Sequence, residues 1–286
     1  MNLNFWVIQA FNGVSYGALL FLVGSGLSLI FGVMRIVNLS HGSYFLLGGY
    51  VALTVIWTTG SWLLALPVSA LAIGLVGLAM ERVFLRPLGF DPLRQVLLTV
   101  GFAFLFQQAA LDIWTGNNFD ITPPAALSQS ITIGGIFFPL YRVFMIVTAL
   151  VIGLALWLIM EKTRIGAMVR ATVDDAQMAR GVGIDTSRIS MMIFSLGAAL
   201  AALGGVIGGA FLGVYIGLDF EMLPIAFAVV IIGGMGSLGG AAIGAMLVGL
   251  ADNFGKALFP EISYFTLYAP MALILAVKPT GLFGRD

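Results

Sequence analysis

The feature that most constrains this chain is the length of its stretches without a charged side chain. Residues 1–34 and 36–80 contain no Asp, Glu, Lys or Arg, and further gaps follow at 95–111, 143–160, 189–218, 222–251 and 262–277. A helix needs about 20 consecutive apolar residues to cross a bilayer. Soluble domains are about 25% charged, whereas this chain is 9% charged and 60% hydrophobic. The pattern excludes a soluble enzyme, a nucleic-acid-binding protein and a disordered protein, and it predicts an all-α polytopic membrane protein.

Interruptions in these gaps divide the chain into nine apolar segments. A polar turn with a tryptophan on each side, 57–62, splits one gap, and the glycine-rich run 233–240 splits another. The segments are 6–31, 43–57, 62–80, 96–114, 142–160, 190–216, 222–235, 241–258 and 264–278. Two of them, 43–57 and 222–235, are shorter than a full crossing needs, so we expect short spans or half-helices there. We therefore predict one membrane domain over residues 1–286 with about eight to nine transmembrane segments.

The positions of the basic residues predict the orientation. Lysine and arginine concentrate in cytoplasmic loops. Eleven of the 13 basic residues fall in the segments 32–42, 81–94 and 161–188 and in the C-terminal tail, which contains Arg285. We expect this face to be cytoplasmic. The N-terminus is then outside, the C-terminus is inside, and the protein is a multi-pass protein of the bacterial cytoplasmic membrane.

Several chemistries are excluded by missing residues. The chain has no cysteine and one histidine, His41, so thiol catalysis and a thiolate or histidine metal site are not expected. A phosphate-binding G-x-x-x-x-G-K-[ST] loop and an HExxH pattern are both missing. We predict that the chain is not an enzyme, holds no metal or cofactor, and that any ATP is bound by partner subunits.

Polar residues between apolar segments are the candidates for a transport pathway, because such groups are costly in a membrane and are often functional. The densest cluster is 38–44, and its candidates are Asn38, Ser40, His41 and Tyr44. Ser40 is a potential N-cap for the short segment that follows, and a helix N-terminus inside a protein-lined cavity would favour an acceptor group. An ordinary capped loop at the cytoplasmic face is the alternative. Ser237 in the glycine-rich run is the fifth candidate.

Small residues predict a packing face on segment 190–216. Gly197, Ala201, Gly205, Gly209 and Gly213 recur at intervals of four, and Gly217 continues the series. Helices in lipid associate through such small residues. We expect another helix backbone against this face, with a pathway-lining or subunit-contact helix as the alternative.

Two hydrophilic segments are long enough to have structure of their own. In 161–188, Ile165, Met168, Val169, Thr172, Val173 and Ala176 follow helical spacing, so we expect one amphipathic helix ending at Gly181 or Gly183, on lipid or in a partner's groove. A charged loop that only fixes topology is the alternative.

Segment 115–141 contains Pro123-Pro124 and predicts a short, ordered external excursion, either a connector or a docking surface.

Four motifs resemble one family, the permeases of branched-chain amino acid ABC importers, and its LivH-type subunit more than the LivM-type partner. They are the Asn-Leu-Ser-His-Gly stretch at 38–42, the Glu-Arg-x-x-x-Arg-Pro-Leu turn at 81–88, the loop at 163–184, and the Gly-Gly-x-Gly-Ser-x-x-Gly stretch at 233–240. Ala176 stands where the family often has proline. In the third motif the resemblance implies ATPase-coupling roles for Arg164, Gly166, Arg170, Asp174, Asp175, Ala179 and Gly183.

The resemblance also implies partners and a function. It implies a second permease subunit, LivM-type or another copy, two cytoplasmic ATP-binding subunits, and an external substrate-binding protein that docks near 115–141 and 217–222. The chain would then carry branched-chain or other hydrophobic amino acids. Importers of this type for urea, amides or aromatic acids are the alternative, with an ion-coupled secondary transporter as a more distant one.

Overall fold

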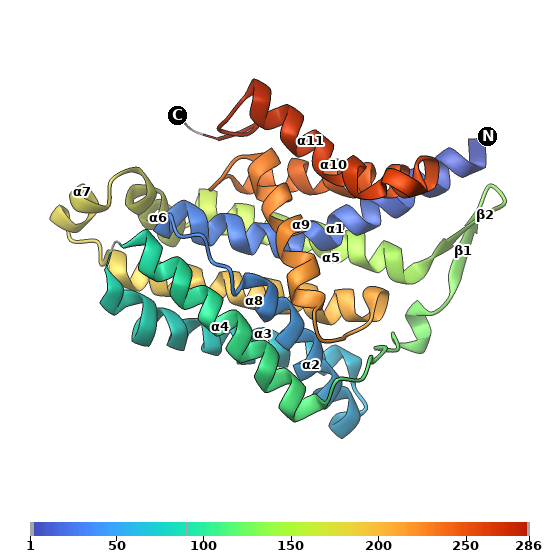
Figure 1. Cartoon of the computed structure of the whole chain (residues 1–286), viewed down its shortest axis with the longest axis horizontal. Coiled ribbons are helices and arrows are strands. Elements are labelled where there is room, and N and C mark those ends of the chain that lie inside the picture. The colour runs from blue at the N-terminus through green and yellow to red at the C-terminus, as the bar shows by residue number, and fades with distance from the viewer. Residues whose placement is uncertain (1–2, 90, 285–286) are drawn as a thin grey trace.

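The computed structural model describes residues 3–89 and 91–284, and within them the chain is almost entirely helical (Figure 1). The helices are α1 (Leu3–Met34), α2 (His41–Thr59), α3 (Trp62–Met80), α4 (Pro92–Trp114), α5 (Leu140–Lys162), α6 (Arg164–Asp174), α7 (Ala176–Gly181), α8 (Thr186–Leu212), α9 (Leu218–Gly233), α10 (Leu238–Leu258) and α11 (Ser263–Val277). Each of the nine predicted apolar segments coincides with one of these helices. Six of the helices are long and apolar enough to cross a bilayer. The predicted all-α polytopic class is therefore confirmed.

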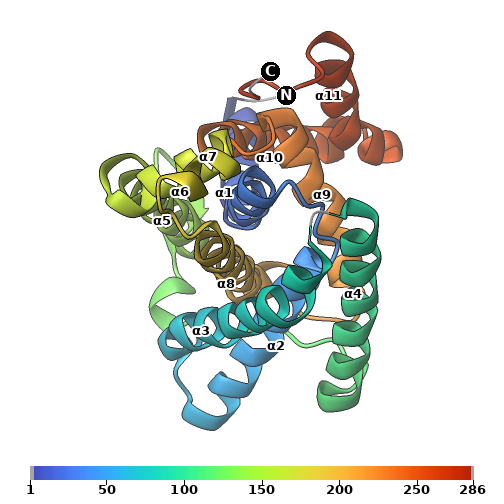
Figure 2. The same ribbon diagram turned by 90° about the vertical axis from the view of Figure 1, so that its left-hand side faces the viewer.

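Helices α1 and α8 form the centre of the bundle, as the end-on view in Figure 2 shows. They approach closely because glycines face each other. A Cβ atom added to Gly26 of α1 would lie 2.6 Å from the carbonyl oxygen of Gly197 of α8. By contrast, α3, α4 and α5 bury much less of their surface and expose leucine, valine and phenylalanine side chains, as expected where helices meet lipid.

Helices α2 and α9 are arranged differently, because they run across the direction of the long helices (Figure 1). Their first turns meet inside the molecule. A Cβ atom at Gly42 of α2 would lie 2.3 Å from the carbonyl oxygen of Asp219 of α9, so only glycine fits at this crossing. His41, which begins α2, contacts the backbone of Val23, well inside α1. Both helices therefore begin in the interior of the bundle and not at its surface.

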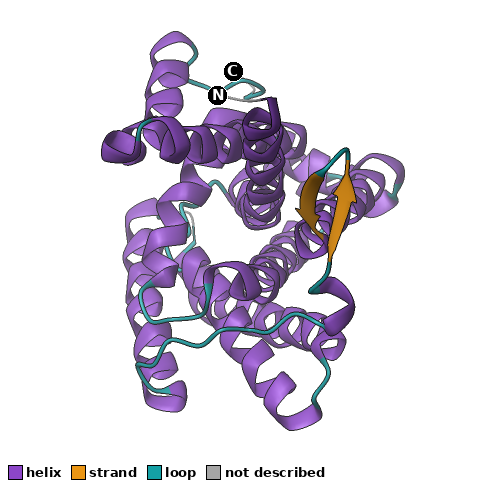
Figure 3. Ribbon diagram, turned by 90° about the vertical axis from the view of Figure 1, so that its right-hand side faces the viewer, coloured by secondary structure: helices purple, strands orange, loops and turns teal. Residues whose placement is uncertain are grey.

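The two ends of the bundle differ in structure. At one end, the end of α1, the turn after α3 and the loop between α5 and α8 lie together, and these are the segments predicted to be basic and cytoplasmic. Arg285 lies outside the described residues. The opposite end carries the 115–141 excursion, in which strands β1 (Ser130–Ile133) and β2 (Ile136–Pro139) form an antiparallel hairpin (Figure 3). The sequence did not predict this hairpin. Which end faces the cytoplasm stays a prediction.

Two predicted helix boundaries are wrong. Segment 190–216 ends early, because α8 stops at Leu212 and Gly213 adopts a positive φ of 81°. Gly213 and Gly217 therefore belong to a turn and not to a helical packing face. The predicted single amphipathic helix of the 161–188 loop is two helices, α6 and α7, because the chain is extended at Asp175.

Candidate functional site

The polar cluster at 38–44 lies inside the chain. Asn38, Ser40, His41 and Tyr44 are fully buried. The Ser40 hydroxyl donates to Oδ1 of Asn38 at 2.7 Å, and the Tyr44 hydroxyl donates to the sulfur of Met80 at 2.8 Å. The alternative, an ordinary capped loop at the cytoplasmic face, does not fit the burial of these side chains or the missing side-chain cap at Ser40. Their role in transport stays a prediction.

The capping expectation for this cluster differs from the structure. Ser40 occupies the N-cap position of α2, but its side chain makes no capping hydrogen bond. Its hydroxyl is bound to Asn38 instead, which shapes the loop that enters the bundle. Ser237 does cap its helix, since its hydroxyl accepts a hydrogen bond of 3.0 Å from the backbone N–H of Gly240 at the start of α10. Its carbonyl oxygen also accepts from Ser28 of α1.

The Nε2 atom of His41 lies 3.0 Å from the carbonyl oxygen of Val23. With Nε2 as donor, this hydrogen bond ties the first residue of α2 to the middle of α1. No group of three or more metal-ligating side chains occurs among residues 3–89 and 91–284. The geometry is that of a histidine that positions one helix against another.

Asp219 is a site residue that the sequence reasoning missed. It lies in 217–222, a segment expected near an external docking surface, yet it is 2% exposed and its Oδ2 atom accepts a hydrogen bond of 3.2 Å from the hydroxyl of Ser43. The only sequence signal was a glycine two residues earlier, Gly217, whose positive φ in the structure allows the chain to turn inward. Burial of Leu218 and Asp219 also removes both from any surface at 217–222.

The glycine series on α8 contacts three different elements. Gly197 lies against Gly26 and Ile30 of α1, Gly205 lies against the backbone of Phe45 of α2, and Gly209 lies against Ile121 of the excursion. Ala201 between them is fully buried. The small side chains thus allow α8 to touch both α1 and α2 directly.

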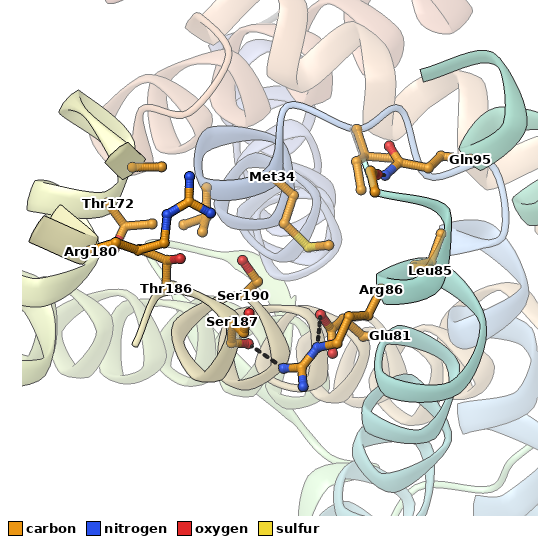
Figure 4. A pocket seen from close by; sticks show the side chains of 14 residues that line it. Met34, Glu81, Leu85, Arg86, Gln95, Thr172, Arg180, Thr186, Ser187 and Ser190 are labelled. Atoms are coloured by element: carbon orange, nitrogen blue, oxygen red, sulfur yellow. Dashed lines mark hydrogen bonds and ion pairs between the residues drawn. The ribbon is translucent and has the colours of Figure 1, made fainter. Parts of the chain in front are cut away.

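A hollow of about 140 Å³ opens at the basic end of the bundle, between the end of α1, the turn after α3, α6 and the start of α8 (Figure 4). The turn consists of a π-helical segment, Glu81–Leu85, and a 3-10 turn, Arg86–Leu88. Glu81 is buried, and Nε of Arg86 lies 3.8 Å from its carboxylate. Arg86 also donates a hydrogen bond of 2.9 Å to the carbonyl oxygen of Ser187. Arg86 therefore links the end of α3 to the start of α8.

The loop between α5 and α8 is anchored to this chain through α6. Val169 and Thr172 of α6 are buried, and Val169 packs in a cluster with Leu29, Leu156 and Ile189. The centre of the apolar face of α6 is thus covered by the chain itself, whereas Ile165 at its start is 39% exposed. Contact of the exposed part with lipid or a partner stays a prediction. Its amphipathic pattern is nevertheless real.

The residues to which the resemblance gave coupling roles shape this loop. Gly166 sits against the backbone of Met160, where a Cβ would clash, and the Arg170 guanidinium bonds the Met160 carbonyl and pairs with Glu161. Asp175 caps α7 by accepting from the backbone N–H groups of Gln177 and Met178 at 2.8 and 2.9 Å. Ala179 is buried, Gly183 turns the chain with a φ of 90°, and Arg164 and Asp174 are exposed.

Helix α7 projects from the bundle at this end (Figure 1). Met178 is 65% exposed and Val182 is 71% exposed, outside the helices that could cross a membrane. Exposed apolar side chains on a projecting, water-facing element are typical of a contact surface for another protein. The most exposed apolar side chains of the loop are therefore Met178 of α7 and Val182 directly after it.

One pattern associated with hydrolases is also present. Gly13-Val14-Ser15-Tyr16-Gly17 matches G-x-S-x-G, which in hydrolases forms a strand–turn–helix elbow. Here it lies within the continuous helix α1, and the Ser15 hydroxyl donates to the carbonyl oxygen of Phe11 at 2.7 Å. The geometry is not that of a catalytic nucleophile.

Comparisons with known proteins agree with this architecture. The model of the family described as branched-chain amino acid transport system / permease component matches residues 9–275. The chain belongs to this family. It is 32% identical to the high-affinity branched-chain amino acid transport system permease protein LivH of Salmonella typhimurium, over 98% of this chain and 96% of the relative.

More distant relatives support the same assignment. The permease is 28% identical to the corresponding protein BraD of Pseudomonas aeruginosa, over 97% of this chain and 95% of the relative. It is 27% identical to a probable LivH permease of Methanocaldococcus jannaschii, over 96% of this chain and 91% of the relative. No solved structure matches. The chain is thus the permease subunit of an ABC importer and a multi-pass protein of the bacterial inner membrane.

Proposed function

We propose that this permease carries branched-chain and other aliphatic amino acids as one of two permease subunits in an importer driven by two cytoplasmic ATP-binding subunits. The LivH and BraD relatives are named as permease proteins of branched-chain amino acid transport systems. The sequence has no phosphate-binding loop, so a partner must hydrolyse the ATP. We propose accordingly that the chain has no catalytic activity of its own.

The observation that carries the proposal is the exposed apolar surface of α7. Met178 and Val182 project from the basic end of the bundle, and α6 behind them is packed against α1, α5 and α8. A force applied to α7 is therefore passed to the central helices, with Arg86 as a second connection between α3 and α8. We propose that the ATPase subunits dock on α7 and that their closure moves these helices.

The opposite end is proposed to receive the external substrate-binding protein. A groove of about 390 Å³ lies there between the turn after α2 and the excursion, and it is lined by Ile56, Gly60, Ser61, Trp62, Leu63, Thr122, Pro123 and Pro124. It favours 115–141 as the docking surface over 217–222. In this orientation the basic end is cytoplasmic, which agrees with the positive-inside rule.

The experiment is co-purification followed by transport in proteoliposomes. Val182→Glu places a charge in the proposed ATPase contact, so the ATPase subunits should no longer co-purify. Ile133→Glu is the control, because Ile133 is 63% exposed on the hairpin at the far end. Retention of the ATPase subunits by Val182→Glu would contradict the docking assignment.

One observation favours a second candidate, an ion-coupled secondary transporter. Asp219 is a buried carboxylate inside the bundle, and its Oδ1 atom has no hydrogen-bond partner among the described residues. Such carboxylates serve proton or sodium coupling in transporters. Uptake of leucine into proteoliposomes that lack the ATPase subunits, driven by a proton or sodium gradient, would establish this candidate in place of the importer.

A further inference from the structure

The exposed side chains of the spans are not equally apolar on all sides of the bundle. In the middle of α3 and α5 the exposed side chains are apolar, as at Leu71 and Leu150. One side differs, because Gln108 and Asp112 of α4 and Glu221 of α9 are all exposed. Amides and carboxylates facing hydrocarbon are costly, so residues of this kind normally face protein or water.

These polar groups lie on either side of a contact between α4 and α9, and we call the surface around this contact the α4–α9 strip. Leu97, Gly101, Phe104 and Gln108 follow the spacing 4, 3, 4 and so share one face of α4. The ring of Phe104 lies 5.6 Å from the ring of Phe220, which joins this face to the first turn of α9. A Cβ atom at Gly101 would have no neighbour within 4 Å, so the surface is open there.

The strip extends from the middle of α4 to its last turn, where Asp112 lies two residues before Trp114. Phe104 is in the middle of α4 (Pro92–Trp114), which is itself long and apolar enough to span. The next residue after Phe220 is Glu221, while Asp219 before it bonds to Ser43 at the buried start of α2. The carboxylate of Glu221 therefore lies near the middle of the bundle and not at its aqueous end.

The carboxylates of the strip are held by local hydrogen bonds. The Tyr215 hydroxyl donates to Oε2 of Glu221 at 2.7 Å, and the Gln108 amide donates to Oδ1 of Asp112 at 2.9 Å. Residues 97–112 and 213–225 contain no lysine or arginine. The strip thus presents negative charge beside aromatic rings.

We propose that the α4–α9 strip faces the second permease subunit and forms one wall of the water-filled path that the amino acid follows between the two subunits. In this path Glu221 and Asp112 attract the ammonium group of the substrate, while Phe104 and Phe220 contact its aliphatic side chain. The inference rests on the proposed function, since it needs a second permease and an amino acid as cargo. A strip with acids and no bases also disfavours anionic solutes.

The first test measures water access at the strip. The chain has no cysteine, so an introduced cysteine is its only reactive thiol. Gly101→Cys is compared with Leu150→Cys, which lies in the middle of α5 on a fully apolar face. Both variants are assembled into the complete importer and exposed to a water-soluble cationic methanethiosulfonate reagent. Gly101→Cys should react at least about tenfold faster, because a thiol in lipid is not ionised. Equal reaction rates would overturn the placement of the path.

The second test measures substrate recognition. Glu221→Gln removes one carboxylate of the strip, and Glu261→Gln makes the same change at an exposed carboxylate outside it. Because a charge-assisted hydrogen bond is lost, leucine uptake at low concentration should fall about tenfold in Glu221→Gln only. Glu221→Asp keeps the charge and should restore part of the uptake, which excludes a simple folding defect. Equal uptake by the two glutamine variants would overturn the ammonium role.

The two tests separate this inference from the proposed function. If the ATPase subunits do not co-purify with the permease, the proposed function fails whatever the strip does. If ATP-driven leucine uptake is present but Gly101→Cys is as unreactive as Leu150→Cys, the proposed function stands and the α4–α9 strip is not the path.

Discussion

The hydroxyl of Ser43 on α2 donates a hydrogen bond of 3.2 Å to the carboxylate of Asp219 on α9. This contact joins the first turns of the two short helices inside the bundle, next to the close approach of Gly42 to the α9 backbone. Because both helices begin in the interior, their relative position is fixed here and not at the membrane surface.

We predict that this hydrogen bond contributes to stability. Asp219→Ala should lower the free energy of unfolding by about 2 kcal/mol, because a buried bond to a charged group is lost. Ser43→Ala should have a smaller effect of about 1 kcal/mol. The melting temperature in detergent measures both. Thr59→Ala, which removes an exposed hydrogen bond to Val55, is the control and should leave the melting temperature nearly unchanged. Additive losses in the double variant would show that the two groups do not interact.

The crossing of α2 and α8 depends on the absence of a side chain at Gly205. A Cβ atom there would lie 1.9 Å from the carbonyl oxygen of Phe45. Gly205→Ala should therefore destabilise the permease by about 2 kcal/mol through overpacking, seen as a lower yield of folded protein in detergent. A Cβ atom at Gly239 would have no neighbour within 4 Å, so Gly239→Ala should leave the yield of folded protein unchanged. A stable Gly205→Ala variant would mean that the two helices can separate at no cost.

Arg86 is predicted to hold the end of α3 to the start of α8. Arg86→Ala removes the bond to Ser187 and leaves the buried Glu81 carboxylate without its ion pair. We expect a loss of about 2 kcal/mol in thermal stability. Arg94→Ala breaks an exposed ion pair with Asp91 and should cost about 0–1 kcal/mol. If the two variants melt at the same temperature, the Arg86 connection has no structural role.

The cap at Asp175 is predicted to matter for coupling. Asp175→Ala removes two hydrogen bonds at the start of α7 and should weaken that helix by about 1 kcal/mol. Because α7 is the proposed ATPase contact, we expect ATP hydrolysis to continue while leucine uptake falls. Asp185→Ala removes a similar cap from α8 and is the matched control. The rates of ATP hydrolysis and of leucine uptake are measured in proteoliposomes for both variants. Full uptake by Asp175→Ala would contradict the prediction.

The candidate site was only partly predictable from the residues. Asn38, Ser40, His41 and Tyr44 were recognised as a polar group beside a short segment, but their burial depends on how the loop before α2 enters the bundle. Asp219 was missed because a carboxylate seven residues beyond the end of α8 resembles a loop residue in any one-dimensional hydropathy profile. The family motif at 81–88 was noticed, yet the bond between Arg86 and Ser187 joins residues far apart in the chain.

The sequence by itself determined the class of the protein, because the cost of burying charge in hydrocarbon is a local property that charge-free segments reveal. It also determined the nine apolar helices and the gathering of basic residues at one end. Only the tertiary structure decided where the short helices begin, that the centre of the apolar face of α6 is covered by its own chain, and that Phe104 of α4 meets Phe220 of α9. These features depend on close backbone contacts between distant segments, as at Gly42 and Asp219, and such contacts leave no periodic signal in either segment alone.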